Sequence, residues 1–193
     1  MSRAARNAFV AATLALLVAL AAGCGSGAGG GDYGGAHPDY AVALKGAPKP
    51  LASLYSQGNE LLGGGNDAFE RRLEGLSGYP VVVNKWASWC GPCRAEFPYL
   101  QQASARFGKR VAFLGVNSQD SDDAARTFLG EYPVPYPSYT DPDQEIAGTL
   151  NATLGFPSTA FYDAAGKQVY LRQGGYASEA DLAADLRRYA LGG

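Results

Sequence analysis

Two largely apolar runs mark the middle of the chain, at residues 79–87 and 110–116. The first holds three consecutive valines, and the second is apolar at nearly every position. Runs of this kind predict strands that are buried on both faces, as in a parallel sheet. A helical pattern separates them, from Pro92 to Phe107, with a bend expected at Pro98. Strand, helix and strand in this order predict a right-handed parallel crossover, and therefore an α/β fold.

Shorter signals flank this unit on both sides. Apolar residues at helical spacing, N-cap residues and proline-rich turns set the expected boundaries. The further elements that we expect are, in chain order, a helix over 51–62, a helix that begins at Asn66, a helix over 121–132, a loop and short strand over 132–139, a helix from Asp141 to 150, a hairpin of strands over 158–163 and 168–172, and a last helix from Ser178.

Composition points to one folded domain without a nucleic-acid partner. The chain has 193 residues, of which 47% are hydrophobic, so it is long enough to bury a proper core. Its formal net charge is −2, and no basic stripe of the kind that nucleic acid requires is visible.

The N-terminus has the pattern of a bacterial export signal. Two arginines precede an apolar stretch over residues 8–22, which is too short for a comfortable membrane span. Small residues lead into Cys24 and resemble a bacterial lipobox. We therefore expect residues 1–23 to be a signal peptide and the Cys24 thiol to carry a lipid that anchors the protein to the outer face of the cell membrane. An uncleaved anchor and an ordinary secretory signal are the alternatives.

A glycine-rich segment follows Cys24 and cannot bury enough apolar surface to order itself. We expect residues 24–50 to form a flexible tether with a reach on the order of 25–30 Å. His37, the only histidine, falls in this segment and is expected to be a bystander. The folded part is then expected to comprise an N-terminal extension over 51–65 and a domain over 66–193.

A pair of cysteines stands directly after the first apolar strand, in Cys90-Gly91-Pro92-Cys93. The turn dipeptide places Cys90 at the start of the next helix, where free N–H groups and the helix dipole stabilise a thiolate. Cys90, exposed next to Trp89, is then expected to attack a disulfide, and Cys93 is expected to resolve the mixed disulfide. Half of a zinc site is the alternative, but zinc needs four ligands, and only Cys24 and His37 remain to complete it.

Two stretches carry a family resemblance. Residues 86–98 surround the cysteine pair and include Pro98, and residues 155–159 read Gly-Phe-Pro-Ser-Thr. They resemble the active-site segment and the cis-proline loop of the thioredoxin superfamily. Asn84, where thioredoxins carry Asp, and Glu96 are typical of its TlpA/ResA-like extracytoplasmic branch. The resemblance covers residues 66–190 and implies a three-layer α/β/α thioredoxin fold with a central mixed sheet and the TlpA-like helical insertion.

The resemblance also implies roles for individual residues. The expected catalytic residues are Cys90, Cys93 and Glu96. Glu96 would hold or shuttle the proton that Cys93 must lose, and its alternative is a plain first-turn carboxylate favoured by the helix dipole. The expected substrate-binding residues are Trp89, Gly91, Pro92, Phe156 and Pro157. A cis bond before Pro157 would expose the backbone of Phe156 to an extended substrate segment. We expect Asn84 to be a structural polar group, Trp86 a core residue and Trp89 the rim of the site.

These features predict an extracytoplasmic thiol-disulfide oxidoreductase that needs no metal or cofactor and is a monomer. Its expected partners are protein thiols and disulfides and a membrane electron-donor protein. The Gly-Pro spacer favours a reductant. Relatives in this branch often reduce apocytochrome c cysteines before haem attachment, while others oxidise secreted proteins, so the direction stays open.

Two other classes of thioredoxin-fold protein fit less well. One is a redox-inactive or copper-handling relative, and copper delivery would call for a Cys-x-x-x-Cys spacing and a later histidine, which the chain lacks. A peroxidase would carry Thr-x-x-Cys at the start of the helix, which is also missing.

Overall fold

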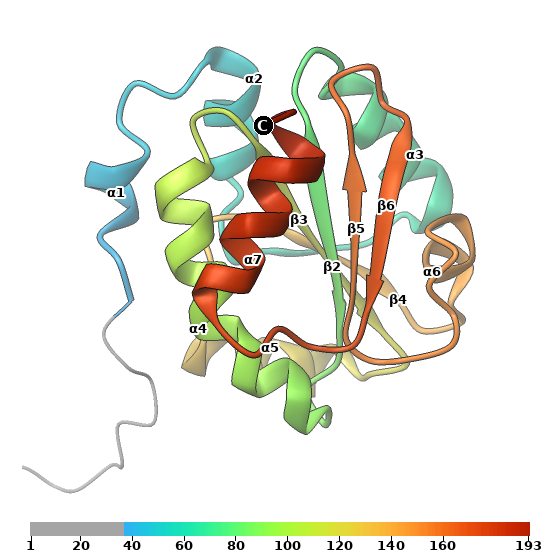
Figure 1. The fold of residues 1–193 in the computed structure, drawn as a ribbon. Coiled ribbons are helices and arrows are strands. Elements are labelled where there is room, and N and C mark those ends of the chain that lie inside the picture. Colours follow the sequence, from blue (N-terminus) through green and yellow to red (C-terminus); the bar gives the residue numbers. More distant parts are fainter. Residues whose placement is uncertain (1–36) are drawn as a thin grey trace, which may run out of the picture. The chain divides into compact units, whose positions relative to one another are not determined.

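The computed structural model describes residues 37–193. The expected signal peptide, the expected lipid site at Cys24 and residues 24–36 of the expected tether lie outside these residues. The described chain forms one mixed sheet covered by helices on both faces (Figure 1). The expected three-layer α/β/α fold is therefore confirmed.

The sheet has six strands in the order β1-β4-β3-β2-β5-β6. The strands are β1 (Leu61–Leu62), β2 (Val81–Trp86), β3 (Ala112–Ser118), β4 (Ser138–Asp141), β5 (Ser158–Tyr162) and β6 (Gln168–Gln173). β2 is central, because it pairs in parallel with β3 and antiparallel with β5. All its residues are buried, as the apolar run predicts.

Helices cover the two faces. They are α1 (Tyr40–Ala43), α2 (Lys49–Tyr55), α3 (Gly65–Gly75), α4 (Gly91–Phe107), α5 (Asp122–Glu131), α6 (Glu145–Thr149) and α7 (Glu179–Asp185), which continues as a π-helical turn, η1 (Leu186–Ala190). Buried side chains of α4, α5 and α7 share one hydrophobic cluster with alternate residues of β2. Those of α2, α3 and α6 share the second cluster, on the other face. Figure 1 shows α4 and α7 in front of the sheet.

The expected helix over 51–62 is wrong in its second half. α2 ends at Tyr55, and Leu61 and Leu62 form the short edge strand β1, which pairs with Ser138 and Tyr139. Asn59 redirects the chain between them. It takes a left-handed backbone conformation with φ 64°, donates to the carbonyl of Leu129 and accepts from the N–H of Val134. These distant partners, rather than local helical spacing, decide this segment.

Part of the expected tether is also helical. α1 lies within it and is capped by the Asp39 carboxylate, which accepts from the N–H of Val42. The Tyr40 hydroxyl donates to the carbonyl of Pro133, so side-chain contacts fix this segment to the domain. Leu51 and Leu54 of α2 are fully buried, so this part of the expected N-terminal extension packs into the core.

Other helix starts depart from the pattern by a residue or a few. α3 begins at Gly65 after Gly64, and Asn66, the expected N-cap, instead accepts a hydrogen bond from Thr149. α6 begins four residues after Asp141, yet the Asp141 carboxylate accepts from the N–H groups of Ile146 and Ala147. Asp141 therefore caps this helix from a distance.

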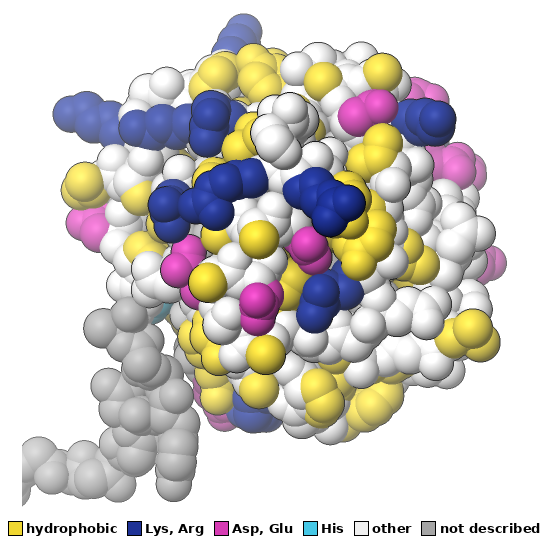
Figure 2. All heavy atoms as spheres, viewed as in Figure 1, with side chains coloured by type: hydrophobic (Ala, Val, Ile, Leu, Met, Phe, Trp, Pro, Cys, Tyr) yellow, Lys and Arg dark blue, Asp and Glu magenta, His cyan; other side chains and the backbone are white. Residues whose placement is uncertain are grey.

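Charged side chains are unevenly distributed. Figure 2 shows several Lys and Arg side chains gathered on part of the viewed face, with acidic side chains between some of them. Arg106 pairs with Glu179 at 3.4 Å, and Arg172 pairs with Asp185 at 3.5 Å.

Within residues 37–193, no helix is long and apolar enough to span a membrane.

Candidate active site

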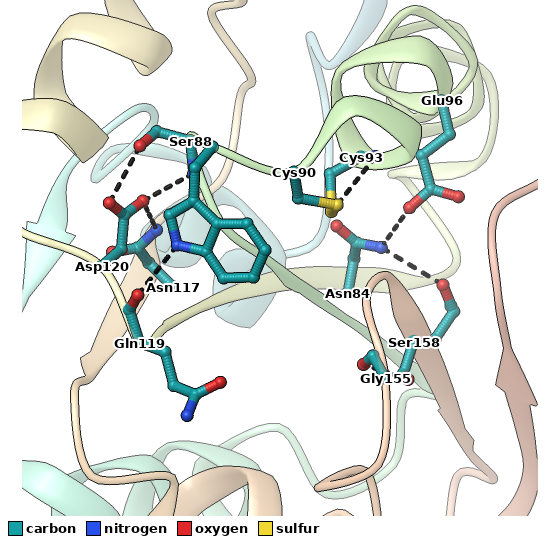
Figure 3. The surroundings of a disulfide bond; sticks show 12 residues. Asn84, Ser88, Cys90, Cys93, Glu96, Asn117, Gln119, Asp120, Gly155 and Ser158 are labelled. Carbon is teal, nitrogen blue, oxygen red and sulfur yellow. Dashed lines mark hydrogen bonds between the residues drawn. A yellow bond between two sulfur atoms is a disulfide. The ribbon is translucent and has the colours of Figure 1, made fainter.

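The cysteine pair forms a disulfide at the start of α4 (Figure 3). The S–S distance is 2.03 Å, and the Cα atoms of Cys90 and Cys93 are 5.3 Å apart. Cys90 is the N-cap residue, and its Sγ accepts a hydrogen bond from the N–H of Cys93 at 3.1 Å. The Gly91-Pro92 spacer forms the first turn of the helix, where proline costs no hydrogen bond. The position of the pair is therefore the one that the sequence predicts.

Both cysteines are buried in this disulfide form. Cys93 is 0% exposed and Cys90 only 4%, and both belong to the hydrophobic cluster beneath α4. The expectation of an exposed Cys90 is therefore wrong for the oxidised protein, because ring closure holds its sulfur against the helix start. The exposed neighbour is Trp89, at 59%, while Trp86 is buried in the core, as expected for each.

Glu96 lies one turn along α4 from Cys93 and is 0% exposed. Burial raises its pKa from 4.5 to about 7, even though hydrogen bonds favour the charged form. The N–H of Tyr176 donates to Oε2 at 3.0 Å, and the Asn84 amide donates to Oε1 at 2.8 Å. A carboxyl group with a pKa near neutrality can both release and take up a proton at physiological pH.

Asn84 connects the central strand to this carboxylate. Its Nδ2 also donates to the Thr159 hydroxyl at 3.3 Å, while its Oδ1 is buried without a hydrogen-bond partner. Figure 3 shows the Asn84 amide pointing toward both the disulfide and Glu96. Asn84 thus holds one oxygen of Glu96 in place, a structural role of the kind that the sequence predicts.

The cis-proline loop, residues 155–159, lies across the site from the cysteines. The Phe156–Pro157 peptide bond is cis, as expected from the resemblance. The Phe156 ring meets the Trp89 ring edge-on, with centroids 4.9 Å apart. The two predicted substrate-binding aromatics are therefore in contact, and together they form an apolar rim beside Cys90.

Sequence reasoning missed Asp120, which fixes the approach to Cys90. Its carboxylate accepts four hydrogen bonds, from the N–H and hydroxyl of Ser88, from the Asn117 amide and from the N–H of Ser121. Burial alone would raise the pKa of Asp120, but these bonds outweigh it and lower that pKa below its usual value. The neighbouring carbonyl of Gln119 accepts from the Trp89 indole at 2.9 Å.

The signal that could have pointed to Asp120 is its position in the chain. Asp120 follows the carboxyl end of β3, next to the carboxyl end of β2, and functional side chains of α/β sheets gather at this edge.

Sequence reasoning also missed the loop at Gly175 and Tyr176. Tyr176 supplies the N–H that binds Glu96. An added Cβ at Gly175 would lie 3.6 Å from Glu96 Oε2, from Pro157 and from the Pro92 carbonyl. This loop therefore adjoins the acid, the cis-proline and the cysteine turn at once. Among residues 37–193, no three His, Cys, Asp or Glu side chains gather in a way that could hold a metal ion.

The fold and the paired cysteines define a thioredoxin-fold protein with a redox-type disulfide. Residues 63–186 match the Redoxin family, and the chain belongs to that family. The recognition of the thioredoxin superfamily from the sequence is therefore confirmed.

Two curated proteins with known names are similar in sequence to this chain. ResA of Bacillus subtilis, a thiol-disulfide oxidoreductase, is 32% identical over 98 residues, which are 50% of this chain and 54% of ResA. The thiol:disulfide interchange protein DsbE of Pseudomonas fluorescens is 36% identical over 91 residues, 47% of this chain and 49% of DsbE. The chain thus matches about half the length of these curated relatives.

Solved structures agree with the fold. The structure of Mycobacterium tuberculosis DsbF superposes with a TM-score of 0.55 at 30% identity, over 60% of this chain and 84% of DsbF. A secreted disulfide oxidoreductase of the same organism, homologous to Escherichia coli DsbE, superposes with a TM-score of 0.53 at 27% identity, over 60% of this chain and 85% of its own.

Proposed function

We propose that this protein is an extracytoplasmic thiol-disulfide oxidoreductase that reduces protein disulfides through Cys90 and Cys93. The observation that carries the proposal is the Cys90–Cys93 disulfide at the N-terminus of α4, with the buried Glu96 one turn behind it. The relatives named as thiol-disulfide oxidoreductases support the same chemistry.

The first step is attack by the reduced protein. The Cys90 thiolate attacks one sulfur of a substrate disulfide, the substrate S–S bond breaks, and one substrate sulfur leaves as a thiolate. A mixed disulfide then joins Cys90 to the substrate. The N–H of Cys93, which points at Cys90 Sγ in the oxidised protein, is placed to stabilise the thiolate before attack.

The second step releases the product. Cys93 loses its proton and attacks Cys90 Sγ, the mixed disulfide breaks, and the second substrate thiolate departs. Two electrons have then passed to the substrate, and the Cys90–Cys93 disulfide has formed. We assign Glu96 as the proton acceptor for Cys93, because its pKa of about 7 allows it to take up that proton near neutral pH.

The site needs a dithiol donor to return it to the reduced form, and we propose a membrane protein for this role. The Gly-Pro spacer resembles that of thioredoxin, whose couple lies at about −270 mV, and this favours the reducing direction. Reduction of apocytochrome c cysteines is the substrate choice that the TlpA/ResA resemblance favours. Measuring the reduction potential of the pair decides between this direction and oxidation of secreted thiols.

Cysteine variants test the proposal. The purified protein should catalyse reduction of insulin by dithiothreitol, and Cys90→Ser should abolish it because the attacking thiolate is gone. Cys93→Ser should instead accumulate mixed disulfides with substrate, visible as a mass increase that dithiothreitol removes. Full turnover by Cys90→Ser would show that another group is the nucleophile.

A further inference from the structure

A lysine is buried in the central strand beside the active site. Lys85 of β2 is 0% exposed, although lysine is rarely buried without partners. Successive strand residues face opposite sides of a sheet, so Lys85 points away from the side on which Asn84 meets Glu96. The mechanism proposed above does not use it.

The partners of this lysine lie at both ends of one short segment. Its ammonium donates a hydrogen bond to the carbonyl of Ala152. The same ammonium lies 3.9 Å from the centroid of the Phe156 ring, a cation–π contact. Residues 152 and 156 bound a segment whose middle residue, Leu154, is 86% exposed. One buried charge therefore fastens the two ends of an otherwise exposed loop.

Two opposing effects act on the Lys85 ammonium. Burial lowers the pKa of Lys85, and the nearby Asp141 carboxylate acts in the opposite direction. Asp141 is itself held by hydrogen bonds from Ser118, Ile146 and Ala147. The ammonium thus has a counter-charge that is anchored independently of the loop.

The segment is connected to the disulfide through one side-chain contact. The Phe156 ring that Lys85 contacts also meets Trp89, the residue before Cys90. Trp89 is fixed on its other side by the carbonyl of Gln119. The apolar rim of Trp89 and Phe156 is therefore held from one side by the β3–α5 loop and from the other by Lys85.

We propose that Lys85 is a positioning residue that holds segment 152–156, and with it the Phe156 half of the rim, ready for an extended peptide with an apolar residue next to its cysteine. This inference rests on the proposed function. Such a peptide meets a contact surface that is already formed. A small disulfide such as oxidised glutathione reaches Cys90 without needing the rim.

Lys85→Met tests the proposal, because methionine keeps the apolar stem and removes the ammonium. Lys167→Met, in the exposed turn between β5 and β6, is the matched control. Reduced protein is mixed with oxidised glutathione, or with a synthetic peptide that carries one disulfide flanked by apolar residues. The single-turnover rate is recorded against substrate concentration.

For Lys85→Met we expect the half-saturating peptide concentration to rise by about tenfold, from loss of one cation–π contact and one hydrogen bond. The maximal rate with peptide and the rate with glutathione should stay within about twofold of wild type. Lys167→Met should match wild type in the half-saturating peptide concentration, the maximal rate with peptide and the rate with glutathione. An equal loss with both substrates, or an unchanged half-saturating concentration, overturns the role of Lys85. Failure of the wild type to react with either substrate instead overturns the proposed function.

A measurement on proteins that keep Lys85 covers the case in which Lys85→Met does not fold. Ring current from Phe156 should move the Lys85 side-chain NMR signals upfield, and Phe156→Leu should remove that shift. In the Cys93→Ser protein trapped with the peptide, the Lys85 signals should change, whereas the glutathione adduct should leave them in place. Identical Lys85 signals with both adducts would contradict the proposal.

Discussion

At the scale of single residues, Glu96 is the group whose environment most changes its chemistry. It is fully buried, so the charged form lacks solvent, and two hydrogen bonds and the charge of Arg172 favour that form without outweighing burial. The outcome is a pKa of about 7 in the folded protein against 4.5 for the free side chain. The group that we propose as the proton acceptor therefore also weakens the fold when it ionises.

Glu96→Gln should make the stability of the oxidised protein less dependent on pH. Below pH 4.5 the Glu96 carboxyl is protonated in both folded and unfolded wild type. Between pH 4.5 and 7 the unfolded chain releases this proton first, so wild-type stability falls with rising pH, by about 3 kcal/mol for this one group. Chemical denaturation at pH 4, 6 and 8 measures this loss relative to Glu96→Gln.

The exposed Glu74 of α3 offers the control, since Glu74→Gln should follow the wild-type pH profile. Glu96→Gln should also resolve mixed disulfides more slowly at pH 7, because the proton acceptor is missing. Parallel denaturation profiles for wild type and Glu96→Gln would mean that the carboxyl titrates in the folded protein as it does in free solution.

At the scale of elements, the loop after β3 acts as a clamp on the chain that leads into α4. Asp120 accepts four hydrogen bonds, and the two from Ser88 join the loop to that chain. The Cys90 position is therefore set by two strand ends together, rather than by the helix start alone.

Asp120→Ala should destabilise the protein by about 2–3 kcal/mol, because partly buried donors of Ser88 and Asn117 lose their acceptor. It should also make Trp89 more mobile, because the Ser88 backbone is released. Urea denaturation and Trp fluorescence anisotropy measure the two effects. Asp123→Ala, in the exposed first turn of α5, should change stability by less than about 0.5 kcal/mol. Equal effects of the two variants would mean that Asp120 does not hold this loop to the chain before α4.

Elements with strong local patterns were predictable, and those made by distant contacts were not. The apolar run of β2 and the turn dipeptide of α4 carry their structure in neighbouring residues. β1 has only two residues and exists because Asn59 bonds to the carbonyl of Leu129 and to Val134. No periodicity in the chain signals such a strand.

The site divides in the same way. Cys90, Cys93 and Glu96 lie within one short stretch, so motif and spacing were enough to find them. The groups that orient them come from far along the sequence: Asp120 is 32 residues from Ser88, and Tyr176 is 80 residues from Glu96. Lys85 stands in a strand pattern without any motif, and its complete burial is visible only in the structure.

At the scale of the whole molecule, we propose that the domain is held at the outer face of a bacterial cell membrane by a lipid on Cys24. The support is the charged and apolar N-terminal pattern that leads into this cysteine. Ordered structure begins before residue 50, since Tyr40 is bonded to Pro133. The proposed tether is therefore shorter than its composition predicts.

Cys24→Ala should release the protein from the membrane fraction or leave it unprocessed, because the thiol that accepts the lipid is missing. Cell fractionation with detection of the protein in membrane and medium, together with gel mobility, measures this. Ser26→Ala is a neighbouring control that should behave like the wild type. Unchanged membrane association and mobility in Cys24→Ala would favour an uncleaved anchor.

The two-residue strand β1 has a consequence for how copies of the protein behave toward one another. A free sheet edge offers rows of unpaired N–H and C=O groups on which a second chain can continue the sheet. Here the outermost strand on one side contains only Leu61 and Leu62, and Gly63 and Gly64 follow at once. So short an edge gives a second copy few backbone groups to pair with. Copies held close together would therefore have little tendency to join through this edge of the sheet.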